Sequence, residues 1–161
     1  MRDMVKYEIR ELDTTDLKPA LKLIEEVFIQ FEAPGYSELG IKTFENFIEF
    51  ELIRDMLERG LLEFFGCFNN NQIIGVIATR QKNHICMFFV DSKYHKQGIG
   101  KSLFEKVESI ARNHTLMGKI TVNSSPYAVE IYQKLGFEAI SVEQDIDGIR
   151  FTPMEYKIVR K

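Results

Sequence analysis

The feature that most constrains this chain is a short basic turn with two glycines, set between an apolar run and a helical pattern. The turn reads His95-Lys96-Gln97-Gly98-Ile99-Gly100-Lys101-Ser102. Before it stands the apolar run Ile85-Cys86-Met87-Phe88-Phe89-Val90, which favours a strand. After it, apolar residues recur at helical spacing: Leu103, Phe104, Val107, Ile110 and Ala111. The sequence therefore predicts a strand, a tight turn and a helix in succession.

Such a turn favours the binding of a phosphate group. Backbone N–H groups of the turn and of the first helical turn point to one place, and the helix adds the positive end of its dipole. Gly98 and Gly100 let the backbone approach an anion with no Cβ in the way. Lys96 and Lys101 could contact the phosphate or could be solvated surface charges, and the sequence leaves both possibilities open.

Length and composition set the broad class. With 161 residues, 45% of them hydrophobic, we expect a single domain over residues 1–161. The net charge of −3 argues against a nucleic-acid partner, because contact with many phosphates requires a basic face. No apolar run approaches about 18 residues, and the first residues lack the apolar core of a signal peptide, so we expect no membrane segment and a cytoplasmic protein. Cys67 and Cys86 lack metal-ligand spacing, so no metal site is expected.

Hydrophobic periodicity and turn residues outline the other elements. Strands are predicted over Val5–Leu12, Leu61–Phe68, Gln72–Arg80, His84–Val90, Lys119–Asn123, Phe137–Gln144 and Ile149–Val159. Helices are predicted from an N-cap at Asp16 to Phe31, from Thr43 to Gly60 and from Ser124 to Leu135. The first helix carries an apolar stripe made of Leu17, Ala20, Leu21, Ile24, Val27, Phe28 and Phe31. Asn69–Asn71 and Asp147-Gly148 are typical of hairpin turns. This order predicts a mixed sheet with helices packed against it.

One interpretation of the glycine turn is a nucleotide-binding loop. Gly100-Lys101-Ser102 fits the end of the pattern G-x-x-x-x-G-K-[ST], but His95 stands where the first glycine belongs. No later strand clearly ends in a magnesium-binding aspartate, since the nearest candidate, Asp145, lies in a predicted hairpin. A nucleoside triphosphatase is therefore disfavoured.

Two segments of the chain resemble the Gcn5-related N-acetyltransferase (GNAT) family. The family's central signature is a strand, then [RQ]-x-x-G-x-[GA], then a helix; the chain matches it at Gly98 and Gly100, with His95 in place of Arg or Gln. The second segment is Val122-Asn123-Ser124-Ser125-Pro126-Tyr127-Ala128-Val129-Glu130-Ile131-Tyr132-Gln133-Lys134-Leu135-Gly136-Phe137, with the family's closing Tyr-x-x-Leu-Gly-Phe. The spacing of the two segments and the order of elements also agree.

The resemblance implies both a fold and an activity. The fold is a mixed α/β one, with a mostly antiparallel sheet of about seven strands and about four helices. The strands ending at Val90 and Asn123 splay apart to form a cleft for acetyl-CoA. The implied activity is that of an N-acetyltransferase, in which a primary amine of a small molecule or peptide attacks acetyl-CoA directly in a ternary complex. Acetyl-CoA is then a co-substrate, and a homodimer is also implied, with the strand containing Pro153 at an edge.

The resemblance also assigns residues to the acetyl-CoA site. Backbone groups of Phe88, Phe89 and Val90 are expected to pair with the pantetheine amides. The turn from His95 to Ser102 is expected to hold the pyrophosphate, mainly through N–H groups from Gln97 onward. Asn123 and Ser125 are expected to contact the pantetheine arm, although both could simply cap a strand end. A main-chain N–H near Phe89 or Val90 is the implied oxyanion donor.

Tyr132 is the implied catalytic residue, also in contact with the co-substrate. It matches the acid that protonates the departing CoA thiolate in this family, and a phenol of pKa about 10 can donate to a thiolate whose conjugate acid lies near 8.5. The alternative is an aromatic residue packed on the core.

The general base stays open. His84, Asp91, Glu63 and Glu32 are candidates, and each could equally be an ordinary surface charge. The region Glu32–Phe50 is expected to form the acceptor wall, and its aromatic content suits an amine with an apolar portion. A non-catalytic acyl-CoA-binding module with the same fold is the alternative function, and transfer to oxygen or from a longer acyl-CoA shares the same site.

Overall fold

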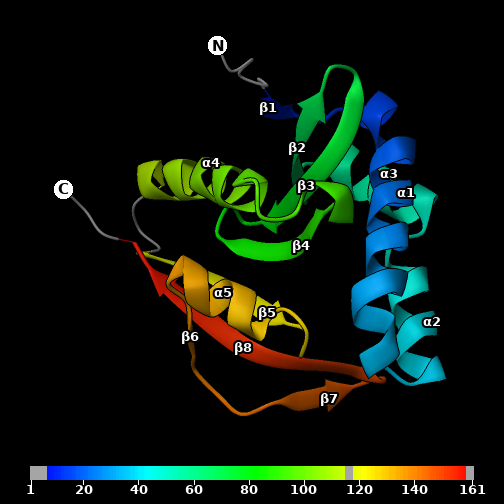
Figure 1. Ribbon diagram of the computed structural model, residues 1–161, viewed down its shortest axis with the longest axis vertical. Helices are drawn as coiled ribbons and strands as arrows, with labels where there is room; N and C mark the ends of the chain where they lie inside the picture. Colours follow the sequence, from blue (N-terminus) through cyan, green and yellow to red (C-terminus); the bar gives the residue numbers. More distant parts are fainter. Residues whose placement is uncertain (1–6, 115–117, 159–161) are drawn as a thin grey trace.

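The computed structural model describes residues 7–114 and 118–158, whose strands form one eight-stranded sheet. The strands follow the spatial order β1-β2-β3-β4-β5-β8-β6, and β7 pairs with β8 beside this path (Figure 1). Their bounds are β1 Glu8–Glu11, β2 Glu63–Asn69, β3 Gln72–Arg80, β4 His84–Val90, β5 Lys119–Ser124, β6 Glu138–Ala139, β7 Gln144–Ile146 and β8 Ile149–Lys157. The paired strands are antiparallel except β4 and β5, which are parallel. The expected mixed, mostly antiparallel sheet is confirmed.

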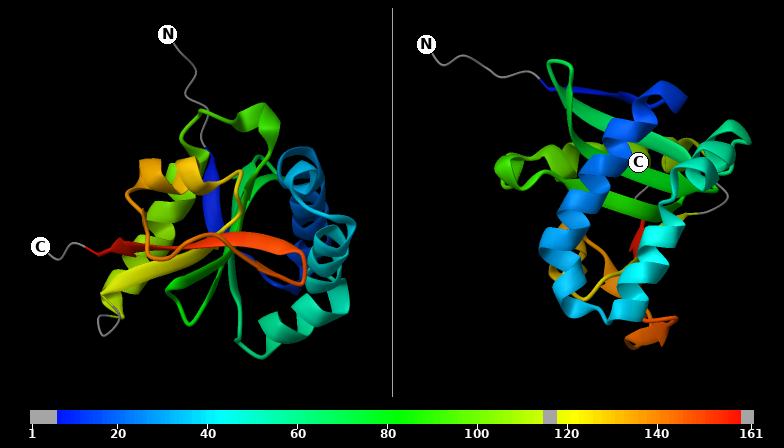
Figure 2. Two further views of the ribbon diagram at one scale, coloured as in Figure 1. Left: turned by 90° about the horizontal axis from the view of Figure 1, so that it is seen from below. Right: turned by 90° about the vertical axis from the view of Figure 1, so that its right-hand side faces the viewer.

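The described residues form five α-helices, which cover both faces of the sheet (Figure 2). Their bounds are α1 Leu17–Val27, α2 Glu38–Phe47, α3 Phe50–Glu58, α4 Ile99–Asn113 and α5 Val129–Leu135. Helices α1 to α3 pack on one face, and α4 and α5 pack on the other. None of these described helices is long and apolar enough to cross a membrane.

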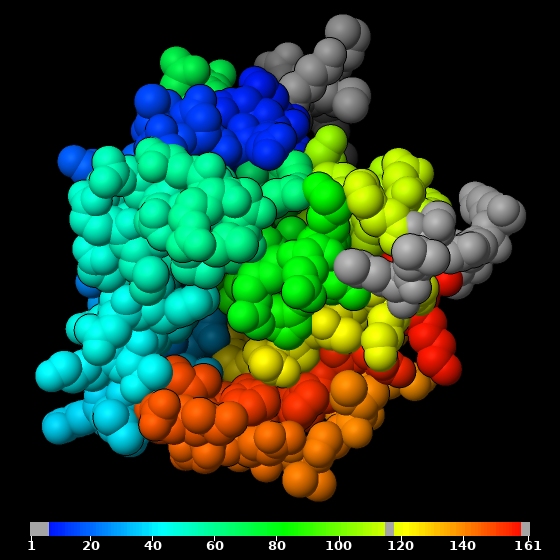
Figure 3. Space-filling model, turned by 180° about the vertical axis from the view of Figure 1, so that it is seen from behind, coloured from blue at the N-terminus to red at the C-terminus, as the bar shows by residue number. Residues whose placement is uncertain are grey.

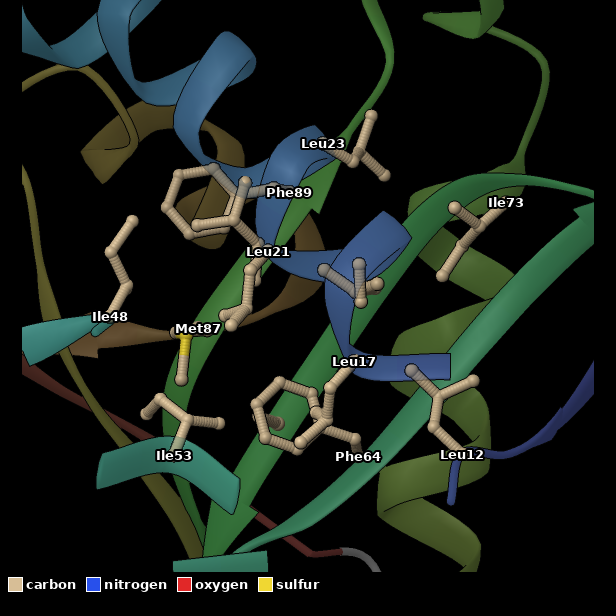
Figure 4. Packing of buried hydrophobic residues seen from close by; sticks show 14 of the residues in the cluster. Leu12, Leu17, Leu21, Leu23, Ile48, Ile53, Phe64, Ile73, Met87 and Phe89 are labelled. Carbon is tan, nitrogen blue, oxygen red and sulfur yellow. The ribbon is translucent and has the colours of Figure 1, made fainter. Parts of the chain in front are cut away.

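Each face of the sheet has its own hydrophobic core. On the α1 face, Leu17 and Leu21 point toward Phe64 of β2 and Met87 of β4 (Figure 4). On the α4 face, Phe65 joins the second cluster. Phe64 and Phe65 are neighbours in sequence, and they point to opposite faces because side chains alternate along a strand. Strands buried on both faces are apolar throughout, which is why β3 reads as a continuous hydrophobic run.

Helix α1 begins differently from the prediction. A 3-10 turn, Thr14–Asp16, precedes it, and Asp13 caps this turn by accepting the N–H of Thr15 at 2.9 Å. Asp16, the predicted cap, makes no side-chain cap bond to α1. Its carboxylate instead accepts two hydrogen bonds of 3.0 Å from Arg10 of β1, so it ties the helix start to the sheet edge.

The end of α1 is also unlike a regular helix. Five residues, Phe28–Glu32, form a π turn in which the Ala33 N–H donates to the Phe28 carbonyl. A π turn inserts one extra residue, which rotates the side chains that follow relative to a regular helix. The predicted stripe is therefore buried up to Phe28, but Phe31 is only partly buried. This rotation matters for Glu32, as described below.

The helix predicted from Thr43 to Gly60 is in fact two helices. Helix α2 begins earlier, and the chain breaks before α3 at Glu49, whose backbone is extended. The Glu49 carboxylate accepts the N–H groups of Glu51 and Leu52 at 3.1 and 2.9 Å and so caps α3. The apolar pattern continues across the break because both helices pack on the same core, which is why the pattern alone did not reveal it.

Two other predicted boundaries are wrong. The segment Phe137–Gln144 contributes only the two residues of β6, and Gln144 already begins β7. The helix predicted from Ser124 begins at Val129, because Ser124 is still paired with β8 as the last residue of β5.

The two predicted hairpin turns are confirmed. Asn70 lies between β2 and β3 with φ +56°, and Asp147 lies between β7 and β8 with φ +53°. The predicted strand Gln72–Arg80 has the observed bounds of β3. Val5 and Val159, the outer ends of the first and last predicted strands, lie outside the described residues.

A bulge in β4 bends the centre of the sheet. Ala78 of β3 faces Met87, but the next residue, Thr79, faces Ile85, so the register between the two strands skips Cys86. Cys86 and Met87 consequently both pack toward the α1 face, whereas Ile85 packs toward the α4 face. An extra residue of this kind bends its strand and increases the local twist.

The bend separates β4 from β5. The parallel ladder between them consists of two register pairs, His84 with Thr121 and Ile85 with Val122. Beyond Ile85, β4 continues to Val90 while remaining paired with β3 on its other edge. The splay predicted for these two strands is therefore confirmed, and it creates the space that the candidate site occupies.

Candidate active site

A cavity of about 460 Å³ lies where β4 and β5 diverge, and we call it the turn-side cavity. Its walls come from the end of α1, the end of β4, the glycine turn and α5. The sequence-predicted residues that line it are Phe88, Phe89, Val90, His95, Lys96, Gly98, Ile99, Gly100, Lys101 and Tyr132. Lining residues that were not predicted for this site include Phe31, Tyr94, Tyr127, Ile131 and Lys134.

The glycine turn presents a helix N-terminus to this cavity. Gly98 has a φ of +79°, in the left-handed region, and stands as the N-cap of α4. The residues that follow, Ile99 to Lys101, form the first helical turn, where backbone N–H groups have no acceptor within the helix. Both Lys96 and Lys101 also line the cavity. The local arrangement therefore suits an anion at this end of the cavity.

Two predicted residues of the turn lie outside the cavity lining. The Gln97 side chain accepts a hydrogen bond from the Tyr7 hydroxyl at 2.8 Å and donates to the Lys93 carbonyl at 3.4 Å. It therefore bonds to residues outside the cavity lining, apart from the cavity itself. The Ser102 N–H donates to the Gly98 carbonyl at 3.0 Å as an ordinary helix bond. Within the stretch from Gln97 to Ser102, the residues that line the cavity are therefore Gly98 to Lys101.

His95 is held against the end of β4. Its Nε2–H donates to the Val90 carbonyl at 2.7 Å, and its ring lies 5.2 Å from the ring of Phe31. Phe31 also stacks on Tyr127, with ring centroids 5.2 Å apart. These three rings line one wall of the turn-side cavity. No sequence signal separated Phe31 from the core stripe, because only the π turn moves it out of register.

A second cavity, of about 410 Å³, lies between α2, β4, β5 and the β7–β8 hairpin, and we call it the α2-side cavity. Seen from behind, the surface is hollowed between α2 in cyan and the hairpin in orange (Figure 3). Its aromatic lining consists of Phe28, Tyr36, Phe44, Phe47, Phe88, Phe89, Tyr132 and Phe151. Its charged lining residues are Glu32 and Asp147.

The two cavities meet at a small set of shared residues. These are Glu32, Phe88, Phe89, Ala128 and Tyr132. Tyr132 is 6% exposed and packs against the rings of Phe88 and Phe137 at 6.0 and 5.2 Å. Burial, and then the nearby Glu32 carboxylate, raise the pKa of the Tyr132 phenol. The phenol therefore stays protonated and able to donate a proton over the neutral range.

Glu32 ends the π turn and reaches the junction of both cavities. Burial raises the pKa of its carboxyl to about 7, and a hydrogen bond with the Ser125 side chain opposes part of this rise. Its charge acts on the surrounding phenols, since it also contributes to the raised pKa values of Tyr36 and Tyr127. A carboxyl with such a pKa can hold or release a proton near neutral pH.

Comparison with known proteins identifies the family. A family model described as "Acetyltransferase (GNAT) domain" matches residues 32–158. The chain belongs to the GNAT acetyltransferase family. The match spans the glycine turn, both cavities and the later strand–helix segment, so the resemblance noted from the sequence is confirmed.

Individual N-acetyltransferases resemble the chain over most of its length. A glucosamine 6-phosphate N-acetyltransferase from Trypanosoma brucei brucei is 28% identical over 159 residues, which cover 91% of this chain and 99% of that protein. Among solved structures, the PaiA N-acetyltransferase of Thermoplasma acidophilum in complex with coenzyme A has a TM-score of 0.78 at 23% identity, covering 94% and 99% of the two chains. A Gcn5-related N-acetyltransferase from Rhodopseudomonas palustris reaches 0.82 at 20% identity, covering 98% and 99%. At these identities the two structures support the GNAT fold.

Of the four base candidates in this GNAT chain, Glu32 alone lines the turn-side and α2-side cavities. His84 bonds across to β5 through Nδ1 at 2.8 Å, and burial lowers the pKa of its imidazole. Asp91 caps the short turn after β4, and Glu63 forms an ion pair with Lys82. These contacts give His84, Asp91 and Glu63 structural roles.

Asn123 and Ser125 lie at the end of β5 and line the α2-side cavity. Ser125 also accepts the Ala128 N–H at 3.3 Å, so it stabilises the turn before α5 as well as facing Glu32. Among residues 7–114 and 118–158 of this GNAT chain, no group of three or more His, Cys, Asp or Glu side chains is arranged to hold a metal ion.

Proposed function

We propose that the protein is an N-acetyltransferase that transfers the acetyl group of acetyl-CoA directly to a primary amine in a ternary complex. The observation that carries this proposal is the meeting of two cavities at Tyr132, one of which ends at a helix N-terminus suited to phosphate. Two comparisons support it: the Trypanosoma relative is an N-acetyltransferase, and the Thermoplasma structure contains coenzyme A.

In this proposal acetyl-CoA occupies the turn-side cavity. The N–H groups of Ile99, Gly100 and Lys101 hold the pyrophosphate, and the charges of Lys96 and Lys101 add to the attraction. The pantetheine arm lies along the free edge of β4, where backbone groups of Phe88–Val90 pair with its amides as they would with a strand. The two-pair ladder between β4 and β5 supports this step, because it leaves that edge without a strand neighbour.

The thioester then lies at the junction of the cavities. Asn123 and Ser125 contact this end of the arm. The His95 ring forms part of the wall of the turn-side cavity, and its Nε2–H is already used in the bond to the Val90 carbonyl. Holding the amine and the thioester together contributes several kcal/mol, on the order of that measured for well-oriented intramolecular reactions.

The chemical step needs an oxyanion donor and an acid. The amine nitrogen attacks the carbonyl carbon, a C–N bond forms, and the C–S bond then breaks. A main-chain N–H near Phe89 or Val90 stabilises the transient oxyanion. Tyr132 gives its phenol proton to the departing thiolate.

Calorimetric titration of the purified protein with acetyl-CoA, dephospho-CoA and magnesium–ATP tests the donor assignment. We expect binding of acetyl-CoA, no heat with ATP, and release of CoA thiol once a suitable amine is added. Binding of ATP without acetyl-CoA would overturn the proposal in favour of a nucleotide-binding loop. Acetyl-CoA binding without turnover of any amine would favour a non-catalytic acyl-CoA-binding module. A cytoplasmic location and a homodimer stay predictions.

A further inference from the structure

One side of the α2-side cavity is closed by contacts between α2 and the β7–β8 hairpin, which we call the clasp. The Thr43 hydroxyl donates to the Asp147 carbonyl at 2.8 Å. The two backbones also touch, since a Cβ on Gly40 would overlap the Gly148 carbonyl oxygen. Only glycine permits so close an approach. These contacts bound the cavity where α2 meets the hairpin.

A second set of contacts holds the clasp from the other side. The Tyr36 hydroxyl donates to the Arg150 carbonyl at 3.2 Å, and Arg150 Nη1 donates to the Gly35 carbonyl at 2.9 Å. The chain segment after the π turn is thus fixed to the first residues of β8. These bonds join residues more than 100 positions apart, so the clasp is a property of the tertiary fold.

The pocket lining is mostly apolar, and its charged side chains are all negative. Aromatic rings dominate its walls, and Phe28 and Phe44 stack at 3.9 Å to form one of them. Its two charged lining residues are carboxylates: Glu32 at the junction with the turn-side cavity, and the exposed Asp147 at the clasp. No lysine, arginine or histidine is among the described residues that line it. Such a lining attracts a cation with an apolar body and places no positive charge beside a phosphate.

We propose that the acceptor is a small primary amine with an apolar body, whose ammonium group is bound and deprotonated by Glu32. This inference rests on the proposed N-acetyltransferase function and specifies its acceptor. The ammonium lies at the junction, next to the thioester, and the apolar body extends toward the clasp. A phosphorylated amino sugar, the acceptor named for the Trypanosoma relative, suits this lining less well, because none of the described residues that line the pocket is a cation that could balance its phosphate.

The protons of the step balance with the residues present. An acceptor R–NH₃⁺ loses two protons as it becomes the amide R–NH–CO–CH₃. Glu32 takes the first, which frees the nitrogen lone pair for attack, and later releases it to solvent. The second replaces the proton that Tyr132 gives to the thiolate, so the products are the amide, CoA thiol and one free proton.

The pH dependence of the reaction follows from Glu32 together with the groups around it. Titratable side chains on the walls of the two cavities are Tyr36, Cys86, Tyr94, His95, Lys96, Lys101, Tyr127, Tyr132, Lys134 and Asp147. Burial raises the pKa values of Tyr36, Tyr132 and Cys86, so these groups stay protonated near neutral pH. We therefore expect kcat/KM to rise with pH up to about 7, where Glu32 becomes ionised, and then to level off.

An amine panel tests the acceptor class with the full chain at pH 8, read as CoA thiol release. The probes are propylamine, pentylamine, phenethylamine, 1,4-diaminobutane, glucosamine 6-phosphate and a short lysine-containing peptide. Each additional buried methylene of the amine should raise kcat/KM about fourfold. Pentylamine has two more methylenes than propylamine, so we expect its kcat/KM to be about fifteenfold higher. Glucosamine 6-phosphate and the peptide are expected to be at least about tenfold slower than pentylamine, because the apolar lining does not compensate the burial of their polar groups. Diaminobutane is expected to be slower by a similar factor, because Asp147 is exposed and offsets too little of the desolvation of a second ammonium group.

The substitution Glu32→Gln tests the residue. It should lower kcat/KM for pentylamine about 100-fold at pH 8 and abolish the rise toward neutral pH, while the acetyl-CoA affinity stays within about twofold. Glu26→Gln, on the exposed side of α1, is the matched control and should behave as the parent. A Glu32→Gln variant as fast as the parent would overturn the assignment.

The remaining outcomes separate this inference from the function on which it rests. If glucosamine 6-phosphate, diaminobutane or the peptide is the fastest acceptor, or if acetyl-CoA binds and no apolar amine reacts, the acceptor class is wrong while the donor assignment stands. If acetyl-CoA does not bind, the proposed function itself fails.

Discussion

At the scale of single residues, burial gives two neighbouring acids different chemical uses. It raises the pKa of Glu32 to about 7, so this carboxylate can accept a proton near neutral pH. It raises the pKa of Tyr132 as well, so that phenol retains its proton under the same conditions. One water-poor junction therefore supplies a proton acceptor and a proton donor side by side.

The role of Tyr132 predicts a specific kinetic defect. In Tyr132→Phe the ring still packs against Phe88 and Phe137, but the thiolate loses its proton donor. We expect kcat to fall about 100-fold and the acetyl-CoA dissociation constant to change less than about twofold, measured by thiol release and calorimetry. Tyr156→Phe, which removes a phenol bonded to Glu108 away from both cavities, is the control. Equal turnover in Tyr132→Phe and the parent would show that another group protonates the thiolate.

Burial of Glu32 also predicts a link between stability and pH. Its folded-state pKa of about 7 lies above the ordinary value of 4.5, so the stability that it contributes is full below pH 4.5 and is lost as pH rises through 7. At pH 8 the ionised carboxylate costs the folded state free energy that a neutral amide does not. Glu32→Gln should therefore raise the free energy of unfolding at pH 8 by about 2 kcal/mol and change it little at pH 4.

Urea unfolding at both pH values measures this effect. Glu26→Gln again serves as the control, since its exposed side chain should show no such pH dependence. A Glu32→Gln variant that is less stable at pH 8 than the parent would mean that the charge of Glu32 stabilises the fold.

At the scale of secondary structure elements, local signals predicted most strands and helices but missed the two inserted residues that shape the site. The run containing Cys86 is apolar throughout, so alternation could not reveal the residue at which the β4 bulge changes face. Regular helical spacing assigned Phe31 to the core, whereas the π turn places it beside His95. Both irregularities depend on tertiary packing, and neither can be recognised from the types of residue at that position in the sequence.

The turn before α4 predicts a matched pair of glycine variants. Gly98 and Gly60 both have left-handed backbones, with φ of +79° and +71°, and a Cβ at either would meet nothing within 4 Å. Alanine at each position should cost about 1–2 kcal/mol of unfolding free energy. Only Gly98→Ala should also weaken acetyl-CoA binding, by about tenfold or more, because only Gly98 orients the N–H groups that face the turn-side cavity.

Thermal unfolding and calorimetry on both variants measure these two effects. If Gly60→Ala weakens acetyl-CoA binding as much as Gly98→Ala does, the loss reflects general destabilisation, and the phosphate cradle is not at this turn.

At the scale of the whole molecule, the site combines what sequence could predict with what it could not. The glycine turn and the strand–helix segment with Tyr132 are local motifs, so their places in the fold were predictable. Selecting Glu32 among four base candidates required knowing that it lines both cavities, whose other walls come from residues as far along the chain as Phe151. The contact between Gly40 and Gly148 is similarly distant, and glycine alone gives no indication of which backbone will approach it.

The divergence of β4 and β5 has a further consequence for the architecture. Two register pairs connect the first four strands to the group formed by β5, β8, β6 and β7. Beyond Ile85, the edge of β4 that faces β5 has no strand neighbour among the described residues, so backbone N–H and C=O groups on that edge are available to a ligand. A pantetheine arm carries amides of its own, and in the proposed complex these amides form hydrogen bonds with the backbone groups on that edge. The co-substrate then acts as an additional strand beside β4, and it extends the pairing along that edge beyond the two register pairs with β5.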